Sequence, residues 1–288
     1  MPGARLAGLM ALQLQWYPGH MTKGRRELAA LMPSQDVVIE VLDARLPRSS
    51  SNPVITELRG DKPCIKVLTK SDLADPAVTA QWLAHYVAQP HVQAFASTTD
   101  RPAETRKRIA QLSHGLALHR GRDKTVRALI AGVPNVGKST LINTLANRLV
   151  AKVSDKPAVT KEQQTVVLDG GMTLTDSPGL MWPKIEDEHA AFRMALAGSI
   201  PDTAIDYPII ARFGAAYLVK HYVPLLVARF KLAATPADAE ALLVDIGRRR
   251  GLLLKGGVID LHKAAEILVH EFRAGTIGRM SLETPPVA

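Results

Sequence analysis

The stretch VRALIAGVPNVGKST, residues 126–140, decides the fold. Its first six residues are apolar apart from one arginine, as expected of a buried strand. The rest fits the pattern G-x-x-x-x-G-K-[ST] through Gly132, Gly137, Lys138 and Ser139, between that strand and a helical pattern. In this context the backbone amides of the loop and of the helix N-terminus point at phosphate oxygens. The stretch predicts a strand–loop–helix unit that binds nucleotide phosphates, whereas an ordinary glycine-rich turn would not need these flanking elements.

The residue types in this phosphate loop have separate expected roles. Lys138 would neutralise charge on the β- and γ-phosphates, and the Ser139 hydroxyl would ligate Mg²⁺. We expect six consecutive residues to bind the phosphates: Asn135, Val136, Gly137, Lys138, Ser139 and Thr140.

Apolar, β-branched runs that end in polar or glycine-containing turns occur on both sides of this unit. Helical patterns over 76–88, 103–118 and 138–149 separate most of them, which is typical of a mostly parallel α/β sheet. Residues 165–176 instead predict a hairpin, because Gly170 and Gly171 lie between two short strands. The predicted strands are 36–44, 64–70, 91–97, 126–132, 165–169 and 172–176.

Only helical patterns follow residue 185. They cover 188–197, 208–229, 236–250 and 260–273, and Asp260 is the expected N-cap of the last. The sequence therefore predicts a P-loop-type α/β domain over residues 1–185 and a small all-helical domain over residues 186–288.

The segment DSPGL, residues 176–180, ends one of the predicted strands. Asp176 stands where a carboxylate associated with Mg²⁺ is expected, and Gly179 can offer its amide to the γ-phosphate. Between this segment and the phosphate loop, Thr160 is the preferred threonine for sensing Mg²⁺. Thr165 is its rival, and spacing does not decide between the two.

The choice of purine is predicted by LTKSD, residues 68–72, which matches the [NT]-K-x-D pattern for reading guanine. Asp72 can accept hydrogen bonds from the ring N–H and the exocyclic amine of guanine, a pair that adenine does not offer. The alkyl stem of Lys70 can lie along the base, and Thr69 replaces the commoner asparagine. FASTT, residues 95–99, ends the next predicted strand and would bring Ser97 and Thr98 to the guanine carbonyl. A helix N-cap after a strand is the alternative for TKSD, and an ATP-using enzyme would conflict with Asp72.

The order of these motifs is unusual, because the base-reading motifs precede the phosphate loop. The order indicates a circular permutation, which is possible where the original termini lie close together. DSPGL then leads directly into the helical domain. A change of this segment on loss of the γ-phosphate could therefore reorient that domain.

The charge of the chain is clustered. The net charge is +9; residues 101–127 carry eight basic and two acidic side chains, and residues 20–26 carry three basic and none acidic. A clustered positive field favours a polyanion such as RNA, and a solvated basic face is the alternative.

The single cysteine, Cys64, fits a reducing cytosol and excludes an internal disulfide. Charged residues interrupt the most apolar later window, 203–228, so no membrane span is expected. We expect a cytoplasmic monomer.

Taken together, these motifs resemble the YlqF/RbgA family of circularly permuted GTPases over about residues 14–283. The resemblance is carried by TKSD and by WYPGHM (16–21), LDARLPRSSSNP (42–53), GVPNVGKSTLIN (132–143), DKPAVTKEQQ (155–164), DSPGLMWPK (176–184) and the tail from IGRRRGLLLKGG to GRMSLE. It implies a GTPase of low basal rate that acts in late assembly of the large ribosomal subunit, with GTP, Mg²⁺, ribosomal RNA and ribosomal proteins as partners. Departures are Thr69 for Asn, Ala158 for Gly and Ser177 for Thr, none of which removes a phosphate or Mg²⁺ group.

The catalytic group is the least defined part of the site. Many GTPases place a glutamine directly after D-x-x-G to orient water, but this chain has Leu180. A neutral imidazole can orient water or accept its proton, so His20 is the leading candidate, and the resemblance points to the same histidine. It also implies that Asn135 helps bind K⁺. The alternative function is a nucleotide-gated scaffold for RNA or protein with negligible catalysis.

Overall fold

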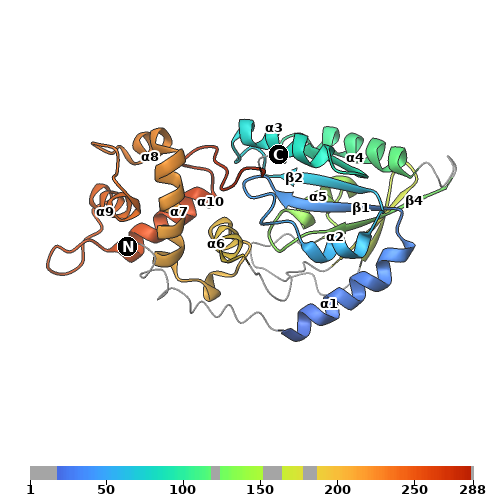
Figure 1. Cartoon of the computed structure of the whole chain (residues 1–288), viewed down its shortest axis with the longest axis horizontal. Coiled ribbons are helices and arrows are strands. Elements are labelled where there is room, and N and C mark those ends of the chain that lie inside the picture. The colour runs from blue at the N-terminus through green and yellow to red at the C-terminus, as the bar shows by residue number, and fades with distance from the viewer. Residues whose placement is uncertain (1–17, 118–123, 152–163, 178–186, 287–288) are drawn as a thin grey trace. The chain divides into compact units, whose positions relative to one another are not determined.

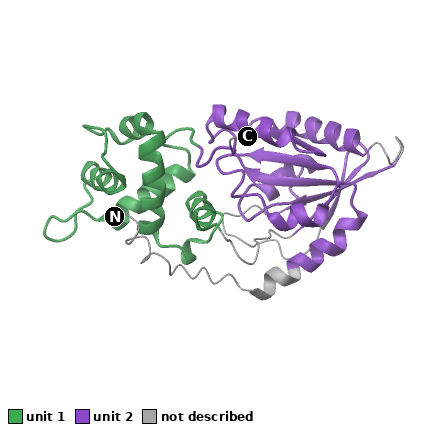
Figure 2. Cartoon of the chain, viewed as in Figure 1, with its two compact units in different colours: residues 1–16, 187–280 green, residues 17–186, 281–288 purple. Residues whose placement is uncertain are grey.

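The computed structural model describes residues 18–117, 124–151, 164–177 and 187–286, and these residues form two compact units (Figure 2). The sheet unit holds the described residues up to 177 together with residues 281–286. The helical unit holds residues 187–280. The sequence pattern placed residues 281–286 with the helices, whereas in the structure they pack within the sheet unit.

The sheet has six strands in the order β3-β2-β1-β4-β6-β5 (Figure 1). Neighbouring strands are parallel except β5 and β6, which are antiparallel. Their bounds are β1 Val37–Asp43, β2 Cys64–Thr69, β3 Val92–Ala96, β4 Val126–Ala131, β5 Gln164–Leu168 and β6 Met172–Asp176. The prediction of a mostly parallel α/β sheet is confirmed, including the hairpin at Gly170 and Gly171, whose φ angles are 83° and 75°.

The helices of the sheet unit begin where the sequence signals a start. Four of the five have proline as their first residue, which suits a position whose N–H has no partner within the helix. Asn52 and Asp75 cap two of them by accepting hydrogen bonds from Val54 N (3.0 Å) and Ala77 N (2.8 Å). The bounds are α1 Pro18–Leu31, α2 Pro53–Arg59, α3 Pro76–Val87, α4 Pro102–Leu116 and α5 Lys138–Ala146, and a 3-10 helix covers Met32–Ser34.

Both faces of the sheet are covered, because every residue of β1 and of β2 is buried. Side chains from α1, α2 and α3, among them Leu28, Ile55 and Trp82, share one core cluster with these strands. Helix α4 packs against α5. Because most of these strands are parallel, their carboxyl ends lie at one edge of the sheet, which is where ligands bind in open α/β sheets.

The helical unit contains α6 Glu188–Ala197, α7 Tyr207–His221, α8 Val223–Phe230, α9 Ala239–Arg249 and α10 Leu261–Arg273, with a 3-10 helix at Asp202–Ala204. The prediction of one helix over 208–229 was wrong. Pro224 cannot donate an N–H to a continuous helix, and the chain leaves helical geometry at Tyr222 (φ −135°, ψ 28°). Asp260 caps α10 as predicted, accepting from Lys263 N at 3.0 Å. None of the helices in the described ranges is both long and apolar enough to cross a membrane.

Candidate nucleotide-binding site

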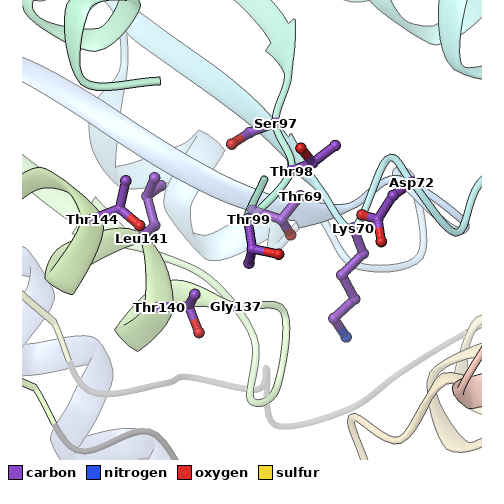
Figure 3. Close-up of a pocket in the computed structure, with 10 residues that line it drawn as sticks. All are labelled: Thr69, Lys70, Asp72, Ser97, Thr98, Thr99, Gly137, Thr140, Leu141 and Thr144. Atoms are coloured by element: carbon purple, nitrogen blue, oxygen red, sulfur yellow. The ribbon is translucent and has the colours of Figure 1, made fainter. Parts of the chain in front are cut away.

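A pocket of about 210 Å³ opens at the carboxyl ends of β2 and β3, beside the N-terminal half of α5 (Figure 3). Its lining joins three segments that are far apart in the sequence: the TKSD loop, the loop after β3, and the phosphate loop with α5. The lining residues are Thr69, Lys70, Asp72, Ser97, Thr98, Thr99, Gly137, Thr140, Leu141 and Thr144. All of these residues belong to the sheet unit. The fold therefore brings the predicted base-reading residues to the phosphate loop.

The phosphate loop needs glycine at two positions, for different reasons. A Cβ on Gly132 would lie 2.7 Å from the carbonyl oxygen of Val41 in β1, so any side chain would push the loop off the sheet. Gly137 has a φ of 98°, a left-handed conformation that favours glycine. Helix α5 starts directly after it, which exposes the amides of its first turn to the loop.

Lys138 and Asp176 form a buried ion pair at the base of the phosphate loop. The Lys138 ammonium donates a hydrogen bond to Asp176 Oδ1, and the side chains are 7% and 4% exposed. Burial raises the pKa of the Asp176 carboxyl above its ordinary value, and the charge and hydrogen bond of Lys138 offset only part of that effect. The two predicted phosphate and metal ligands thus neutralise each other in this structure.

The residues next to Lys138 and Asp176 in the sequence carry oxygen atoms of the kind that a magnesium ion binds. A buried carboxylate favours a cation beside it, as the Lys138 ammonium shows. Ser139 lies in the first turn of α5 and is half-buried. The buried Ser177 hydroxyl has no hydrogen-bond partner in the described part of the chain. Mg²⁺ prefers such oxygen ligands and takes the rest of its shell from water and phosphates.

On the base side, Asp72 is exposed and lines the pocket. Within the described ranges its carboxylate makes no hydrogen bond, so its oxygens can accept from a ligand. Lys70 is held differently: it has a left-handed φ of 54°, and its Nζ donates to the backbone oxygen of Asn135 at 2.7 Å. Figure 3 shows the extended Lys70 side chain and the Asp72 carboxylate rising from the same loop.

The Thr69 hydroxyl connects this loop to its neighbours. It lies within hydrogen-bond distance of the backbone oxygens of Leu42, at 2.9 Å, and Val136. A threonine here can therefore tie the TKSD loop to the phosphate loop through a backbone contact. Its predicted role in binding guanine stays a prediction.

Ser97 and Thr98 both line the pocket, as the FASTT segment predicted they would if it reads the base. The Ser97 hydroxyl is 3.0 Å from the Thr105 hydroxyl, and its amide donates to Leu68 O at 2.8 Å. Ser97 therefore fixes the loop after β3.

Several predicted residues cannot be placed in the site. Thr160, Gly179 and Leu180 lie outside the described residues. His20 is in the first turn of α1, and its side chain also lies outside the described part. Thr165 is an exposed residue of β5, paired with Thr175 of β6. The choice between Thr160 and Thr165 stays open.

Three residues that line the pocket were not predicted from the sequence: Thr99, Leu141 and Thr144. Leu141 and Thr144 lie one and four residues after Thr140 on α5, so helical spacing from the phosphate loop could have indicated them. Thr99 follows Ser97 and Thr98 directly.

Fold and pocket together define a P-loop GTPase in which the base-binding strands precede the phosphate loop, the order of a circular permutation. A protein-family model described as "50S ribosome-binding GTPase" matches residues 127–205. Ribosome biogenesis GTPase A of Bacillus cereus is 40% identical over 278 residues, which is 94% of each chain. The protein of the same name from Thermotoga maritima is 32% identical over 277 residues, 94% of this chain and 95% of the relative. The chain belongs to the ribosome biogenesis GTPase A family.

Solved structures agree with this assignment. A GNP-bound structure of YlqF from T. maritima is 29% identical with a TM-score of 0.64, covering 92% of this chain and all of that one. A GDP-bound YlqF structure is 28% identical with a TM-score of 0.66, covering 90% of this chain and 99% of that one. The predicted resemblance and the predicted GTP-hydrolysing activity in ribosome biogenesis are thereby confirmed.

Proposed function

We propose that this GTPase binds Mg²⁺·GTP in the pocket beside α5, docks on the large ribosomal subunit late in its assembly, and leaves after hydrolysis to GDP. The observation that carries this proposal is the convergence of the TKSD loop, the loop after β3 and the phosphate loop on one pocket. Such a pocket would receive the base of a nucleotide at one end and its phosphates at the other. The proposed setting is the cytoplasm, and the proposed protein is a monomer.

Binding of the phosphates and the metal ion would break the ion pair between Lys138 and Asp176. On binding, the Lys138 ammonium would turn to the β- and γ-phosphates, and the Asp176 carboxylate would face the Mg²⁺ shell together with the Ser139 hydroxyl. When bound, Mg²⁺ would offset negative charge on the phosphate oxygens. We further propose that the amides from Asn135 to Thr140 hold the phosphates, as the loop geometry supports.

Basic side chains on both units supply the proposed contacts to ribosomal RNA. Arg101, Lys107 and Arg108 are exposed on or beside α4. In the helical unit, a second exposed group lies at the end of α9 and in the loop that follows it: Arg248, Arg249, Arg250 and Lys255. Phosphate contacts from such residues release counterions, so binding should weaken steeply with salt.

Co-sedimentation with large ribosomal subunits tests the docking step. In the presence of a non-hydrolysable GTP analogue we expect association that weakens from low to physiological salt, and a GTPase rate that rises when subunits are added. The double variant Arg249→Glu/Lys255→Glu should lose association by roughly tenfold or more, since each charge reversal removes a phosphate contact. Arg212→Glu is the matched control, because Arg212 is also exposed in the helical unit but pairs with Glu240 at 3.0 Å. Absence of association with the analogue would contradict the docking proposal.

His20 is the proposed catalytic residue, acting on the attacking water. His20→Ala is expected to lower subunit-stimulated hydrolysis by roughly 100-fold, the usual contribution of a general base, while leaving GTP affinity within about twofold. Single-turnover hydrolysis with and without subunits measures the first quantity, and equilibrium titration the second. An unchanged stimulated rate would remove His20 from the mechanism.

A second candidate function is a nucleotide-gated scaffold with negligible catalysis, which Leu180 favours because leucine cannot polarise water. If subunits leave the GTPase rate unchanged while association still depends on the nucleotide, the scaffold is the better description. The binding of K⁺ through Asn135 stays a prediction; its left-handed φ of 59° is the backbone conformation from which it accepts the Lys70 hydrogen bond.

A further inference from the structure

The motif LDARLPRSSSNP, residues 42–53, has no role in the proposed function, yet its loop is unusually well packed. Between β1 and α2, in residues 44–52, only Arg48 is exposed. Loops normally run over the surface, because buried backbone polar groups must find partners. A buried loop beside the pocket therefore indicates a specific task.

Asp43 is the last residue of β1, directly before this loop, and it is completely buried. Its carboxylate accepts three hydrogen bonds from Arg45: from the backbone N (3.0 Å), from Nε (2.9 Å) and from Nη2 (2.7 Å). It accepts a further hydrogen bond from Lys70 Nζ at 3.0 Å. Burial by itself would raise the pKa of the Asp43 carboxyl, but Arg45 and Lys70 outweigh it and hold that pKa far below its usual range.

Lys70 therefore has two fixed partners. Its ammonium lies between the Asp43 carboxylate, at 3.0 Å, and the Asn135 backbone oxygen of the phosphate loop, at 2.7 Å. The ammonium end of the side chain is thus fixed by two contacts, and Lys70 lines the pocket. The position of the stem depends on where Asp43 holds the ammonium.

Residues 281–286, the returning segment, hold the other side of the same loop. Leu282 N donates to Arg45 O at 2.7 Å, and the Glu283 carboxylate accepts from Ser49 N (2.9 Å) and Ser49 Oγ (2.5 Å). Trp82 Nε1 of α3 donates to Glu283 O at 3.2 Å. Leu282 is 1% exposed and Glu283 is 7% exposed. The returning segment is therefore built into the sheet unit at the loop that carries Arg45.

We propose that Asp43 is a positioning residue for nucleotide binding: it holds the Lys70 ammonium so that the stem of Lys70 lies along the guanine base, and the returning segment holds the loop that fixes Asp43. This inference rests on the proposed guanine site. It gives the 42–53 motif a role in nucleotide binding. It also adds residues 281–286 to the residues that support the nucleotide site, although they are distant in sequence from those that line the pocket.

A double-mutant cycle on GDP affinity tests the proposal, using Asp43→Asn, Lys70→Met and the variant carrying both, each titrated with GDP in Mg²⁺ buffer. Asp43→Asn should raise the Kd roughly tenfold in the otherwise unchanged protein, the scale of a lost charge-assisted hydrogen bond. In the Lys70→Met background the same change should raise the Kd by less than about twofold, because residues that act as a unit are not additive. An equal increase in both backgrounds would overturn the proposal while leaving the guanine site intact.

Two further measurements keep the test decisive. If Lys70→Met does not change the GDP affinity, the position of the Lys70 ammonium does not matter and the inference fails, whereas the guanine site is tested separately by Asp72→Asn. Asp36→Asn is the matched control: Asp36 directly precedes β1, is 5% exposed and pairs with Arg127 at 3.3 Å, at the opposite end of the strand from Asp43, and neither residue lines the pocket. It should lower thermal stability and leave the GDP Kd unchanged.

Should Asp43→Asn not fold, Glu283→Gln carries the test. This change keeps the shape of the side chain but weakens the contacts with Ser49. It should raise the GDP Kd by roughly threefold in the otherwise unchanged protein and leave the Kd unchanged in the Lys70→Met background. A threefold increase that persists there, or no increase in either background, would overturn the role of the returning segment.

Discussion

Asp72→Asn is expected to reverse the base preference of the enzyme, so that xanthosine triphosphate replaces GTP as the preferred substrate. The Asp72 carboxylate accepts two hydrogen bonds from guanine in the proposed complex. An amide can accept only the one from the ring N–H, because its NH₂ then faces the exocyclic amine, which is also a donor. Xanthine presents a carbonyl oxygen in place of the exocyclic amine and suits the amide. We expect kcat/KM for GTP to fall by at least about 100-fold, as in sites built to bind a specific polar group.

Competition between the two nucleotides in a hydrolysis assay measures this change directly. Asp75→Asn is the matched control, because Asp75 lies three residues further on and caps α3 through Ala77 N. That variant should keep its preference for GTP and lose at most about 1 kcal/mol of stability, since asparagine is also a good N-cap. If Asp72→Asn still prefers GTP to the same extent, Asp72 does not read the base.

Lys138→Met is expected to abolish most GTP hydrolysis and, separately, to destabilise the nucleotide-free protein. Without the ammonium, no positive charge from residue 138 offsets the negative charge of the β- and γ-phosphates. The value of kcat/KM should therefore fall by roughly 100- to 1,000-fold, as for other preorganised groups that stabilise a transition state. Without nucleotide, Asp176 would be left as a buried carboxylate with no counter-ion, which costs about 3–5 kcal/mol when a buried pair is broken. Single-turnover hydrolysis and thermal unfolding measure the two effects.

The pH dependence of that instability has a definite sign. Burial already raises the pKa of Asp176, and removal of Lys138 raises it further. A carboxyl group whose pKa is raised by folding destabilises the protein at high pH and ceases to do so as the pH falls through the raised value. The stability deficit of Lys138→Met should therefore shrink on acidification, as the carboxyl with the raised pKa takes up its proton.

A second change separates folding from catalysis. Adding Asp176→Asn to Lys138→Met should restore much of the stability but none of the hydrolysis, because the buried charge is gone and the phosphate ligand is still missing. Lys66→Met breaks the buried pair with Glu40 instead and should reduce stability without a comparable loss of activity. Restored hydrolysis in the double variant would show that Lys138 acts only through folding.

The sheet was predictable because its signals are local. The six apolar runs, the glycine pair at 170–171 and the phosphate loop each specify their own geometry within a dozen residues. The split between α7 and α8 also had a local signal, Pro224, which the apolar spacing over 208–229 concealed. The type of each predicted element therefore followed from the sequence, apart from one helix break, whereas helices α1 and α2 were not predicted.

Only those residues of the candidate site that belong to sequence motifs could be predicted. TKSD, FASTT and the phosphate loop indicated most of the pocket lining, because parallel strands bring their carboxyl ends to one edge. The pairing of Lys138 with Asp176 and the hold of Asp43 on Lys70 join residues 38 and 27 positions apart. The contact of Ser49 with Glu283 spans 234 positions. No periodicity or spacing in a single sequence encodes such pairs.

The packing of Leu282 and Glu283 onto the 45–49 loop has a consequence for how this protein is made. The nucleotide-binding unit contains residues from both sides of the helical unit, so its last contacts form only after residues 281–283 have been synthesised. A nascent chain that ends before them would hold the phosphate loop and the TKSD segment but lack the support for Arg45. GTP binding should therefore reach full strength only after residues 281–283 have been synthesised and have packed onto the 45–49 loop.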